Sequence, residues 1–290
     1  MEAREFSLGE LLAAGAERLR AAGADGVESA ALDAALLLGH VLGRTRSWLL
    51  AHGEAPVEPA ASGRFAGLIG RRAAGEPIAY LVGRKGFWTL ELAVTPAVLV
   101  PRPETELLVE RALALAPSAG PVRALDLGTG SGAIALALAS ERPGWRVTAT
   151  DICPQALLVA GANALALGLG RVELVAGDWL ECLAERSFEL IVSNPPYVAA
   201  SDPALAGAGV RFEPRLALTP GDDGMACLRR IIAAAPAHLT RGGWLLLEHG
   251  ETQARAVRDE LVASGFGQVR SHRDLAGRER MTEGEWPRHR

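Results

Sequence analysis

The sequence predicts an α/β fold in which a mostly parallel, twisted sheet follows a small helical bundle and a β-hairpin linker. Three patterns support this prediction. Apolar residues recur at helical spacing up to residue 72, aromatic and β-branched residues alternate in residues 87–94, and strand-like and helix-like segments alternate from Val122 onward. The expected helical domain, linker and larger α/β domain comprise residues 1–83, 84–105 and 106–290.

Composition and charge restrict the class of protein. The chain has 290 residues, of which 49% are hydrophobic, so it can bury a substantial core. A net charge of −4 argues against a broad basic surface for nucleic acid. No run of residues is long enough to cross a membrane, no signal-peptide pattern opens the chain, and the three cysteines lack metal or redox spacing. We therefore expect a cytoplasmic protein without a metal site.

Residues 7–73 carry the helical pattern. Ser7 and Glu10 predict a capping box at the start of the first helix. The apolar face of this helix would consist of Leu8, Leu11, Leu12 and Leu19. A second helix, with Ser29 as a candidate cap, is expected to carry Leu32, Leu36, Leu37 and Val41. Shorter helices are expected around residues 47–50 and 60–73. Acidic and basic side chains balance over residues 1–85, which suggests a protein-contacting or structural module.

A β-hairpin is expected between the two domains. Residues 75–83 and 87–94, with the run at 98–100, combine aromatic and β-branched residues and together predict this hairpin. Prolines end it near Arg102, and Glu104 or Thr105 opens the next helix. Charge pairs at such a position are commonly solvent-exposed, so the simplest interpretation of Arg102 and Glu104 is an ordinary helix start with a hydrated ion pair.

Residues from Val122 onward follow the strand–helix order of a parallel sheet. Strands are expected at residues 122–126, 147–151, 172–175 and 243–248, with one more running into Asn194. Helices are expected at residues 133–140, 154–166, 225–238 and 252–264, and segments near 269 and 278–282 complete the sheet. Right-handed crossovers would bring the carboxyl ends of the parallel strands to one edge, where open α/β sheets bind their ligands.

The segment Asn194-Pro195-Pro196-Tyr197 stands at the end of one of these strands. The two prolines cannot donate to a sheet ladder, and Asn194 is held in an extended conformation because a proline follows it. The turn presents an amide, carbonyl oxygens and an aromatic ring. These groups suit a planar NH₂ substrate, since acceptors can hold its hydrogens while a ring covers its face. The alternative is a strand-ending turn with a core tyrosine.

A glycine turn and two acidic strand ends suggest a nucleotide-like cofactor. The turn carries Gly128-Thr129-Gly130-Ser131-Gly132 between a strand and a helix, which allows close approach of a ligand, although such turns also occur without one. Asp151 ends the next strand and could hold ribose hydroxyls, or cap a helix. Asp178 and Trp179 follow the third strand, where they could meet and cover an adenine; Trp179 could equally be a core residue.

Nearly the whole chain resembles the release factor glutamine methyltransferases, whose activity is N5-methylation of the glutamine in the Gly-Gly-Gln motif of peptide-chain release factors. The resemblance rests on Arg102-Pro103-Glu104-Thr105-Glu106 together with Asn194-Pro195-Pro196-Tyr197, and also on residues 76–81, 86–88, 125–132, 212–214, 248–250 and 274–278. Thr89 departs from the family pattern, which more often has a glycine there. The family's fold is a Rossmann-like class I methyltransferase domain, so the resemblance implies this fold.

The resemblance also implies site residues and partners. S-adenosyl-L-methionine, which leaves as S-adenosyl-L-homocysteine, would be bound by Gly128, Thr129, Gly130, Ser131, Gly132, Asp151, Asp178, Trp179 and Asn194. The substrate glutamine would be held by Asn194, Pro195, Pro196 and Tyr197, with Phe87 and Arg102 nearby; Asn194, Pro195 and Tyr197 are the expected catalytic residues. The helical domain would dock the release factor. We expect a monomer that acts in translation termination and binds neither nucleic acid nor membrane.

Hydrogen bonds to the acceptor nitrogen would provide most of the catalysis. An amide nitrogen shares its lone pair with its carbonyl, so acceptors on Asn194 and Pro195 would orient the NH₂ group and stabilise the positive charge that develops on it. No strong base is expected beside Asn194, and His249 is interpreted as a structural residue at a strand end.

Three other functions fit parts of the sequence. A methyltransferase for adenine or guanine in nucleic acid would use the same tetrapeptide, but it needs a basic groove around the site. A nicotinamide oxidoreductase is disfavoured by the glycine spacing, in which the third glycine comes one residue early. A protein-interaction module on an inactive methyltransferase scaffold is disfavoured by the intact site residues.

Overall fold

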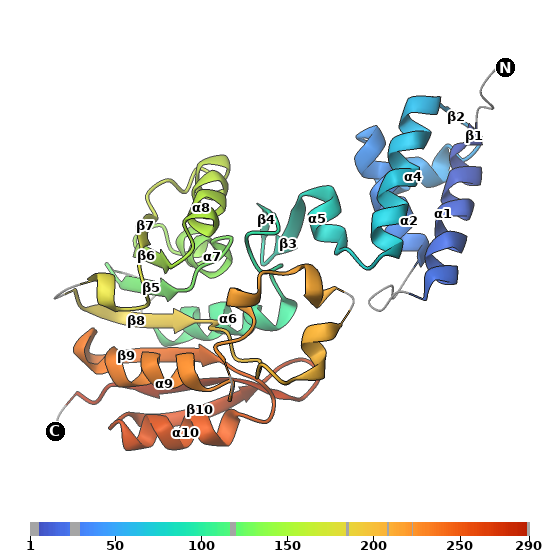
Figure 1. Ribbon diagram of the computed structural model, residues 1–290. Coiled ribbons are helices and arrows are strands. Elements are labelled where there is room, and N and C mark those ends of the chain that lie inside the picture. Colours follow the sequence, from blue (N-terminus) through green and yellow to red (C-terminus); the bar gives the residue numbers. More distant parts are fainter. Residues whose placement is uncertain are drawn as a thin grey trace. The chain divides into compact units, whose positions relative to one another are not determined.

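The computed structural model describes residues 6–23, 30–116, 120–183, 186–207, 209–221 and 223–288. The chain forms two compact units (Figure 1). The smaller unit contains Met1–Arg84 and Ala206–Phe212, and the larger one contains Lys85–Leu205 and Glu213–Arg290. A short segment from the long loop after the Asn-Pro-Pro-Tyr turn therefore belongs to the helical unit, which the sequence did not indicate.

The smaller unit is a bundle of helices with one short pair of strands. Its helices are α1 (Leu8–Ala22), α2 (Ala30–Leu42), α3 (Arg46–Ala51), α4 (Pro59–Ala73) and α5 (Ile78–Val82), and β1 (Phe6–Ser7) pairs with β2 (Pro56–Val57). The predicted capping box is confirmed: Ser7 Oγ accepts from the Glu10 amide at 3.2 Å, and Glu10 Oε2 accepts from the Ser7 amide at 2.8 Å.

The buried face of α2 differs from the predicted one. Leu37 is buried as expected, but the side chains of Leu32 and Leu36 are 36% and 41% exposed. The reason is a long-range ion pair: Arg72 on α4 donates to Asp33 at 2.8 Å, which turns the Asp33 side of α2 inward. The predicted cap Ser29 lies outside the described residues.

The hairpin is shorter than predicted and consists of β3 (Arg84–Phe87) and β4 (Leu90–Ala93). Residues 78–82 form a helix instead of a strand, because the Pro77 carbonyl accepts from the amides of Tyr80 and Leu81 and closes a helical turn. Residues 98–100 lie outside any strand. The hairpin is held against α8 (Pro154–Ala166) by Asn163, whose side chain bonds to both the amide and the carbonyl of Ala93.

The larger unit is built on a seven-stranded sheet in the order β10-β11-β9-β8-β5-β6-β7 (Figure 1). The strands are β5 (Arg123–Leu127), β6 (Arg146–Asp151), β7 (Glu173–Ala176), β8 (Phe188–Ser193), β9 (Leu239–Glu248), β10 (Gly267–Arg273) and β11 (Glu279–Glu285). The five strands from β9 to β7 run parallel, while β11 and β10 add an antiparallel edge. The prediction of a mostly parallel sheet is confirmed.

Helices cover both faces of the sheet. Alternate residues of β5 separate the two cores: Ala124 packs with α6 (Glu106–Leu115) and α7 (Ala133–Glu141), and Leu125 packs with α9 (Ala226–Ala234) and α10 (Ala254–Ala263). Such two-sided burial is typical of parallel sheets and leaves the strand ends as the accessible edge. Within the described parts of the chain, no helix has the length and apolar character needed to cross a membrane.

Candidate functional site

A cavity of about 320 Å³ opens at the carboxyl ends of the parallel strands. Segments that follow β5, β6, β7 and β8 all contribute to its wall, as expected where strand order reverses in an open α/β sheet. The sequence-predicted residues that line it are Gly128, Thr129, Gly130, Ser131, Asp151, Asp178, Trp179, Asn194 and Pro196. The structure thus brings together four strand ends that are distant in the sequence.

The glycine turn after β5 adopts a backbone that other residues rarely take. Gly128, Gly130 and Gly132 have φ values of +71°, +57° and +86°. Asp126, the buried residue near the end of β5, fixes the turn, because its Oδ2 accepts from Thr129 Oγ1 at 2.6 Å and from the Ala135 amide at 3.2 Å. Burial raises the pKa of Asp126 to about 7. No atom lies within 4 Å of where a Gly130 side chain would begin, so the backbone there is accessible to a ligand.

Asp151 at the end of β6 accepts from backbone amides, and its role toward ribose hydroxyls stays a prediction. Its Oδ2 accepts from the Gly130 amide at 2.9 Å, and its Oδ1 accepts from the amide of Cys153, the residue just before α8, at 2.8 Å. The carboxylate therefore connects the glycine turn to the start of the helix. Burial raises its pKa, although these backbone bonds oppose the shift. A carboxylate has about four acceptor sites, so after the backbone bonds from Gly130, Cys153 and Ile152 one stays available for a hydroxyl.

The residues after β7 are placed by packing and by an ion pair. Trp179 has a φ of +50°, and its ring lies against Gly128, where an added side chain would begin 3.2 Å from a ring carbon. The same ring packs against the core formed with α9 and α10, so Trp179 serves the cavity and the core together. Asp178 Oδ2 accepts from Arg230 at 2.7 Å, and Arg230 also lines the cavity. This pairing could not be predicted from the sequence, because the two residues lie 52 positions apart.

The Asn-Pro-Pro-Tyr turn leaves β8 beside the glycine turn. Ser193 Oγ donates to the Leu127 carbonyl at 2.8 Å and ties the ends of β8 and β5 together. Asn194 is partly exposed in the cavity wall, and its side-chain NH₂ donates to Thr105 Oγ1 at 3.1 Å. Pro195 behind it is buried. The amide oxygen of Asn194 is thus the end of the side chain that remains for a ligand.

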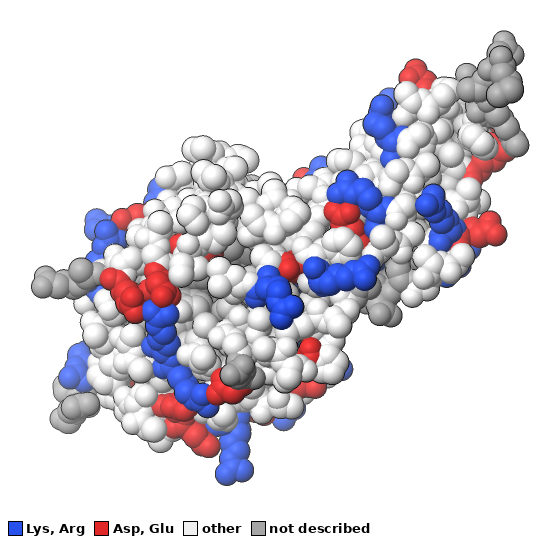
Figure 2. All heavy atoms as spheres, viewed as in Figure 1, with Lys and Arg blue, Asp and Glu red and all other residues white. Residues whose placement is uncertain are grey.

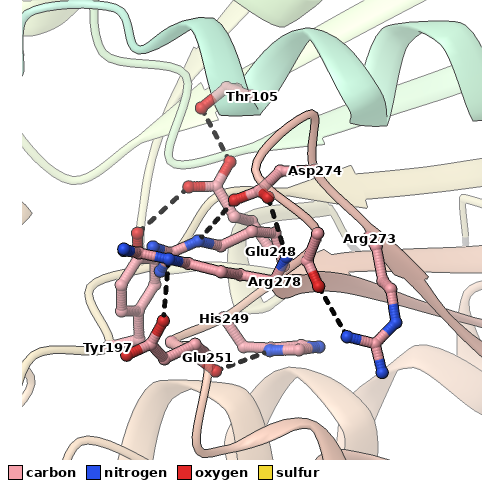
Figure 3. A network of polar contacts seen from close by, with 11 residues as sticks. Thr105, Tyr197, Glu248, His249, Glu251, Arg273, Asp274 and Arg278 are labelled. Carbon is pink, nitrogen blue, oxygen red and sulfur yellow. Dashed lines mark hydrogen bonds and ion pairs between the residues drawn. The ribbon is translucent and has the colours of Figure 1, made fainter.

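Tyr197 and Thr105 meet at one carboxylate, that of Glu248 at the end of β9 (Figure 3). Tyr197 Oη donates to Glu248 Oε1 at 3.1 Å, and Thr105 Oγ1 donates to Oε2 at 2.7 Å. Glu248 is only 2% exposed, and burial raises its pKa to about 7. The burial of Tyr197 and the nearby Glu248 charge raise the pKa of the Tyr197 hydroxyl. Sequence reasoning missed Glu248, although an acid at a strand end was the signal used for Asp151.

The predicted placement of Phe87 near cofactor or substrate stays a prediction. Its side chain is 1% exposed and belongs to the core that packs against α6 and α7, because alternation in β3 points it inward, and it is not part of the cavity wall. Phe87 therefore supports the hairpin.

Arg102 pairs with a distant partner, which corrects the expectation of a hydrated pair with Glu104. Arg102 Nη2 donates to Glu213 Oε1 at 2.5 Å, and the other Glu213 oxygen accepts from the Val100 amide at 3.2 Å. The Arg102 charge is close enough to Tyr197 to lower the pKa of its hydroxyl slightly, against the larger effect of burial. The buried Glu213 thus joins Arg102 and Val100 to a second segment, and the neighbouring Pro101 and Pro214 both line the cavity.

His249 has the structural role that the sequence suggested. Its Nδ1 is 2.9 Å from the Gly250 carbonyl and its Nε2 is 2.8 Å from Thr282 Oγ1, so both ring nitrogens have partners. Burial lowers its pKa and favours the neutral ring.

Comparison with known proteins gives matches to both units. Residues 10–83 match the family model of the PrmC N-terminal domain, and residues 103–208 match that of the methyltransferase small domain. The release factor glutamine methyltransferase of Xylella fastidiosa Temecula1 is 49% identical, over 96% of this chain and 97% of that protein. The enzyme of the same name from Escherichia coli K12 is 47% identical, over 89% and 93%.

Comparison of structures supports the fold. A methyltransferase from Pyrococcus furiosus superimposes with a TM-score of 0.54 at 21% identity, over 75% of this chain and 98% of that one. At this identity the likeness shows the fold alone, and it confirms the predicted methyltransferase fold.

Proposed function

Because this chain belongs to the release factor glutamine methyltransferase family, we propose that it transfers a methyl group from S-adenosyl-L-methionine to the side-chain amide nitrogen, N5, of the glutamine in the Gly-Gly-Gln motif of peptide-chain release factors. One observation in the site carries this proposal beyond the family name. The NH₂ end of Asn194 is engaged by Thr105, so an oxygen acceptor faces the cavity at the place where a substrate NH₂ must be held. A planar amide needs that acceptor.

The residues around the cavity fit S-adenosyl-L-methionine. Gly130 gives an open stretch of backbone, Asp151 retains an acceptor site for a ribose hydroxyl, and Trp179 offers an aromatic face. We assign to cofactor binding the nine residues predicted from the sequence. Asp178 among them also forms an ion pair with Arg230. The bound cofactor supplies a methyl group on a positively charged sulfur, which is already reactive toward a nucleophile.

The protein's remaining task is to prepare the acceptor nitrogen. The Asn194 side-chain oxygen and the Pro195 carbonyl would accept the two hydrogens of the glutamine NH₂ and direct its lone pair along the transfer axis. As the methyl arrives, the nitrogen becomes positive and these two bonds strengthen, so they stabilise the transition state more than the bound substrate. Tyr197 would cover the flat amide, and Arg102 beside it would border the substrate path.

Proton loss follows methyl transfer without a dedicated base. His249 has both nitrogens engaged, and the raised pKa of Tyr197 keeps its hydroxyl protonated at neutral pH. A tetrahedral, N-methylated amide nitrogen is strongly acidic, so water at the open cavity suffices to accept its proton. The methylated product then regains its planar amide.

The helical domain predicted at residues 1–83 would dock the release factor, and the rest of the chain would carry the linker and the methyltransferase domain. The balanced charge of residues 1–85 suits a protein partner better than a nucleic acid. At the cavity, Arg230 is paired with Asp178 and Glu181, and Arg102 is paired with Glu213. On the face in Figure 2, basic side chains stand in small groups interspersed with acidic ones. We propose a cytoplasmic monomer that acts on a protein.

Methyl transfer from radiolabelled cofactor to purified release factor tests the proposal. Label should enter the wild-type release factor and disappear when the glutamine of its Gly-Gly-Gln loop is changed to alanine. Asn194→Ala should lower kcat by about 100-fold or more while the fold is kept, since it removes one acceptor that acts in the transition state. The control for the fold is far-UV circular dichroism with cofactor binding by calorimetry. Label in tRNA, rRNA or DNA but not in release factor would assign the chain to base methylation instead.

A further inference from the structure

A single buried carboxylate connects two members of the Asn-Pro-Pro-Tyr turn. Glu248 accepts from Tyr197 Oη through one oxygen and from Thr105 Oγ1 through the other, at 3.1 and 2.7 Å (Figure 3). Thr105 in turn accepts from the side chain of Asn194 at 3.1 Å. The three contacts join the start of α6, the end of β8 and the end of β9. Along the chain, Thr105 is 89 residues from Asn194 and 143 residues from Glu248.

The direction of these bonds decides which end of Asn194 faces the cavity. A threonine hydroxyl has one hydrogen, and an ionised carboxylate can only accept. The hydrogen of Thr105 therefore goes to Glu248, and Thr105 can only accept from Asn194. This places the NH₂ of Asn194 at Thr105 and leaves its oxygen for the cavity. Without Glu248, Thr105 could donate to Asn194, and the amide could turn over.

We propose that Thr105 and Glu248 are positioning residues that fix the polarity of the Asn194 amide, so that an oxygen and not an NH₂ meets the substrate amide. This inference rests on the proposed function and deepens it. A reversed Asn194 would present hydrogens to the hydrogens of the glutamine NH₂, and the acceptor could not be held. Glu248 at the same time holds the Tyr197 hydroxyl, so one carboxylate sets both the amide and the ring.

The polarity depends on the ionisation of Glu248. A protonated Glu248 would donate to one of the two hydroxyls, and Thr105 could then direct its own hydrogen to Asn194. Burial raises the pKa of Glu248 to about 7, the nearby Glu104 raises it further, and the bonds from Thr105 and Tyr197 and the charge of Arg280 oppose the rise. The favourable polarity is therefore present above this pKa and is lost as the pH falls through it.

Paired substitutions at Thr105 separate orientation from packing. Thr105→Val keeps the shape but removes the hydroxyl, and it should lower kcat by about 100-fold, since a misoriented acceptor group costs on this order. The cofactor Kd and the release factor KM should change by less than about threefold, because the cavity is otherwise intact. Thr105→Ser restores the hydroxyl and should rescue most of kcat. Equal kcat values for the valine and serine variants would overturn the proposal.

A pH profile supplies the second readout. Wild-type kcat should rise about tenfold per pH unit below the Glu248 pKa and level off above it. Glu248→Gln should remove this limb and leave a low, flat profile. The control is Glu283→Gln on the neighbouring strand β11: Glu283 is equally buried but bonds to Arg111, and the variant should keep the acidic limb. An acidic limb that persists in Glu248→Gln would contradict the proposal.

Nuclear magnetic resonance tests the orientation of the Asn194 amide without any turnover. It therefore distinguishes failure of the positioning role from failure of the proposed function. The side-chain ¹⁵N–¹H signals of Asn194, assigned by comparison with Asn194→Ala, should shift between pH 6 and 8 in the wild type but not in Glu248→Gln. Absence of this titration in the wild type would overturn the positioning role. A wild-type enzyme that shows the titration but does not label release factor would refute the proposed substrate alone.

Discussion

At the scale of single residues, the glycine turn shows how backbone conformation sets up a binding surface. Gly130 combines a positive φ with an amide bonded to Asp151, so its local geometry and its long-range contact agree. Any other residue would have to adopt the left-handed region, which is strained for side chains with a Cβ. The turn is therefore specified by residue type as well as by packing.

Gly130→Ala should weaken cofactor binding by about tenfold, because the strain of about 1–2 kcal/mol moves the turn away from its bound geometry. Calorimetric titration with S-adenosyl-L-methionine measures the change. The matched control is Gly63→Ala in the middle of α4, where φ is helical and no atom lies within 4 Å of the added methyl group. That variant should leave the cofactor Kd unchanged and stabilise the smaller unit by about 0.5–1 kcal/mol. Equal effects on binding from the two variants would contradict the expectation.

At the scale of elements, side chains of α6 and α8 hold the hairpin by hydrogen bonds to its backbone amides and carbonyls. Asn163 of α8 bonds to the amide and carbonyl of Ala93 and also donates to the Ser131 carbonyl at 2.9 Å. Glu106 accepts from the Trp88 amide at 2.8 Å, and Trp88 has a φ of +55°. One asparagine thus joins the hairpin to the glycine turn.

Asn163→Ala should destabilise the larger unit by about 2 kcal/mol, because it leaves the buried Ser131 carbonyl and the part-buried backbone groups of Ala93 without their partners. Urea unfolding followed by fluorescence measures the loss. Gln155→Ala on the exposed side of the same helix is the control, expected within about 0.5 kcal/mol of wild type. A similar midpoint for both variants would show that the Asn163 bonds are dispensable.

At the scale of the whole molecule, two buried carboxyl groups make the stability of the fold depend on pH. Asp126 and Glu248 each have a pKa raised to about 7 by burial. In the folded chain, these two carboxyl groups bind their protons more tightly than in the unfolded chain. They therefore contribute stability at low pH, and this contribution is lost as the pH rises through the raised pKa. The same ionisation of Glu248 gives the Asn194 polarity that we propose for activity. The enzyme should therefore be more active where it is less stable.

The free energy of unfolding should fall by about 1–2 kcal/mol between pH 6.5 and 8 as the two carboxyl groups ionise. His249 makes an opposite contribution, because its pKa is lowered from 6.5, and this contribution offsets part of the fall at the low end of the window. Urea titrations at several pH values measure the slope, and Glu248→Gln should reduce it by about half. A stability that rises over this window would show that one or both groups are ionised well below pH 7.

The order of elements in the larger unit could be predicted because it depends on local patterns. Apolar runs bounded by glycine or proline predicted the parallel strands, and the helix at 154–166 agrees with the structure at both ends. The capping box of α1 also needs only residues three apart. Where a feature is decided by its neighbours in the chain, periodicity and residue type were sufficient. The same holds for the strand-end placement of Asp151, Trp179 and Asn194.

Features decided between distant segments were visible only in the tertiary structure. The exposed side of α2 depends on the Asp33–Arg72 ion pair, the partner of Arg102 is Glu213, and Phe87 is core because β3 packs on α6 and α7. The sequence by itself determined the fold class, the glycine turn and the Asn-Pro-Pro-Tyr turn, since these follow from local periodicity and contiguous motifs. The tertiary structure decided which end of Asn194 faces the cavity, because Thr105 and Glu248 meet it only when three separate segments pack together.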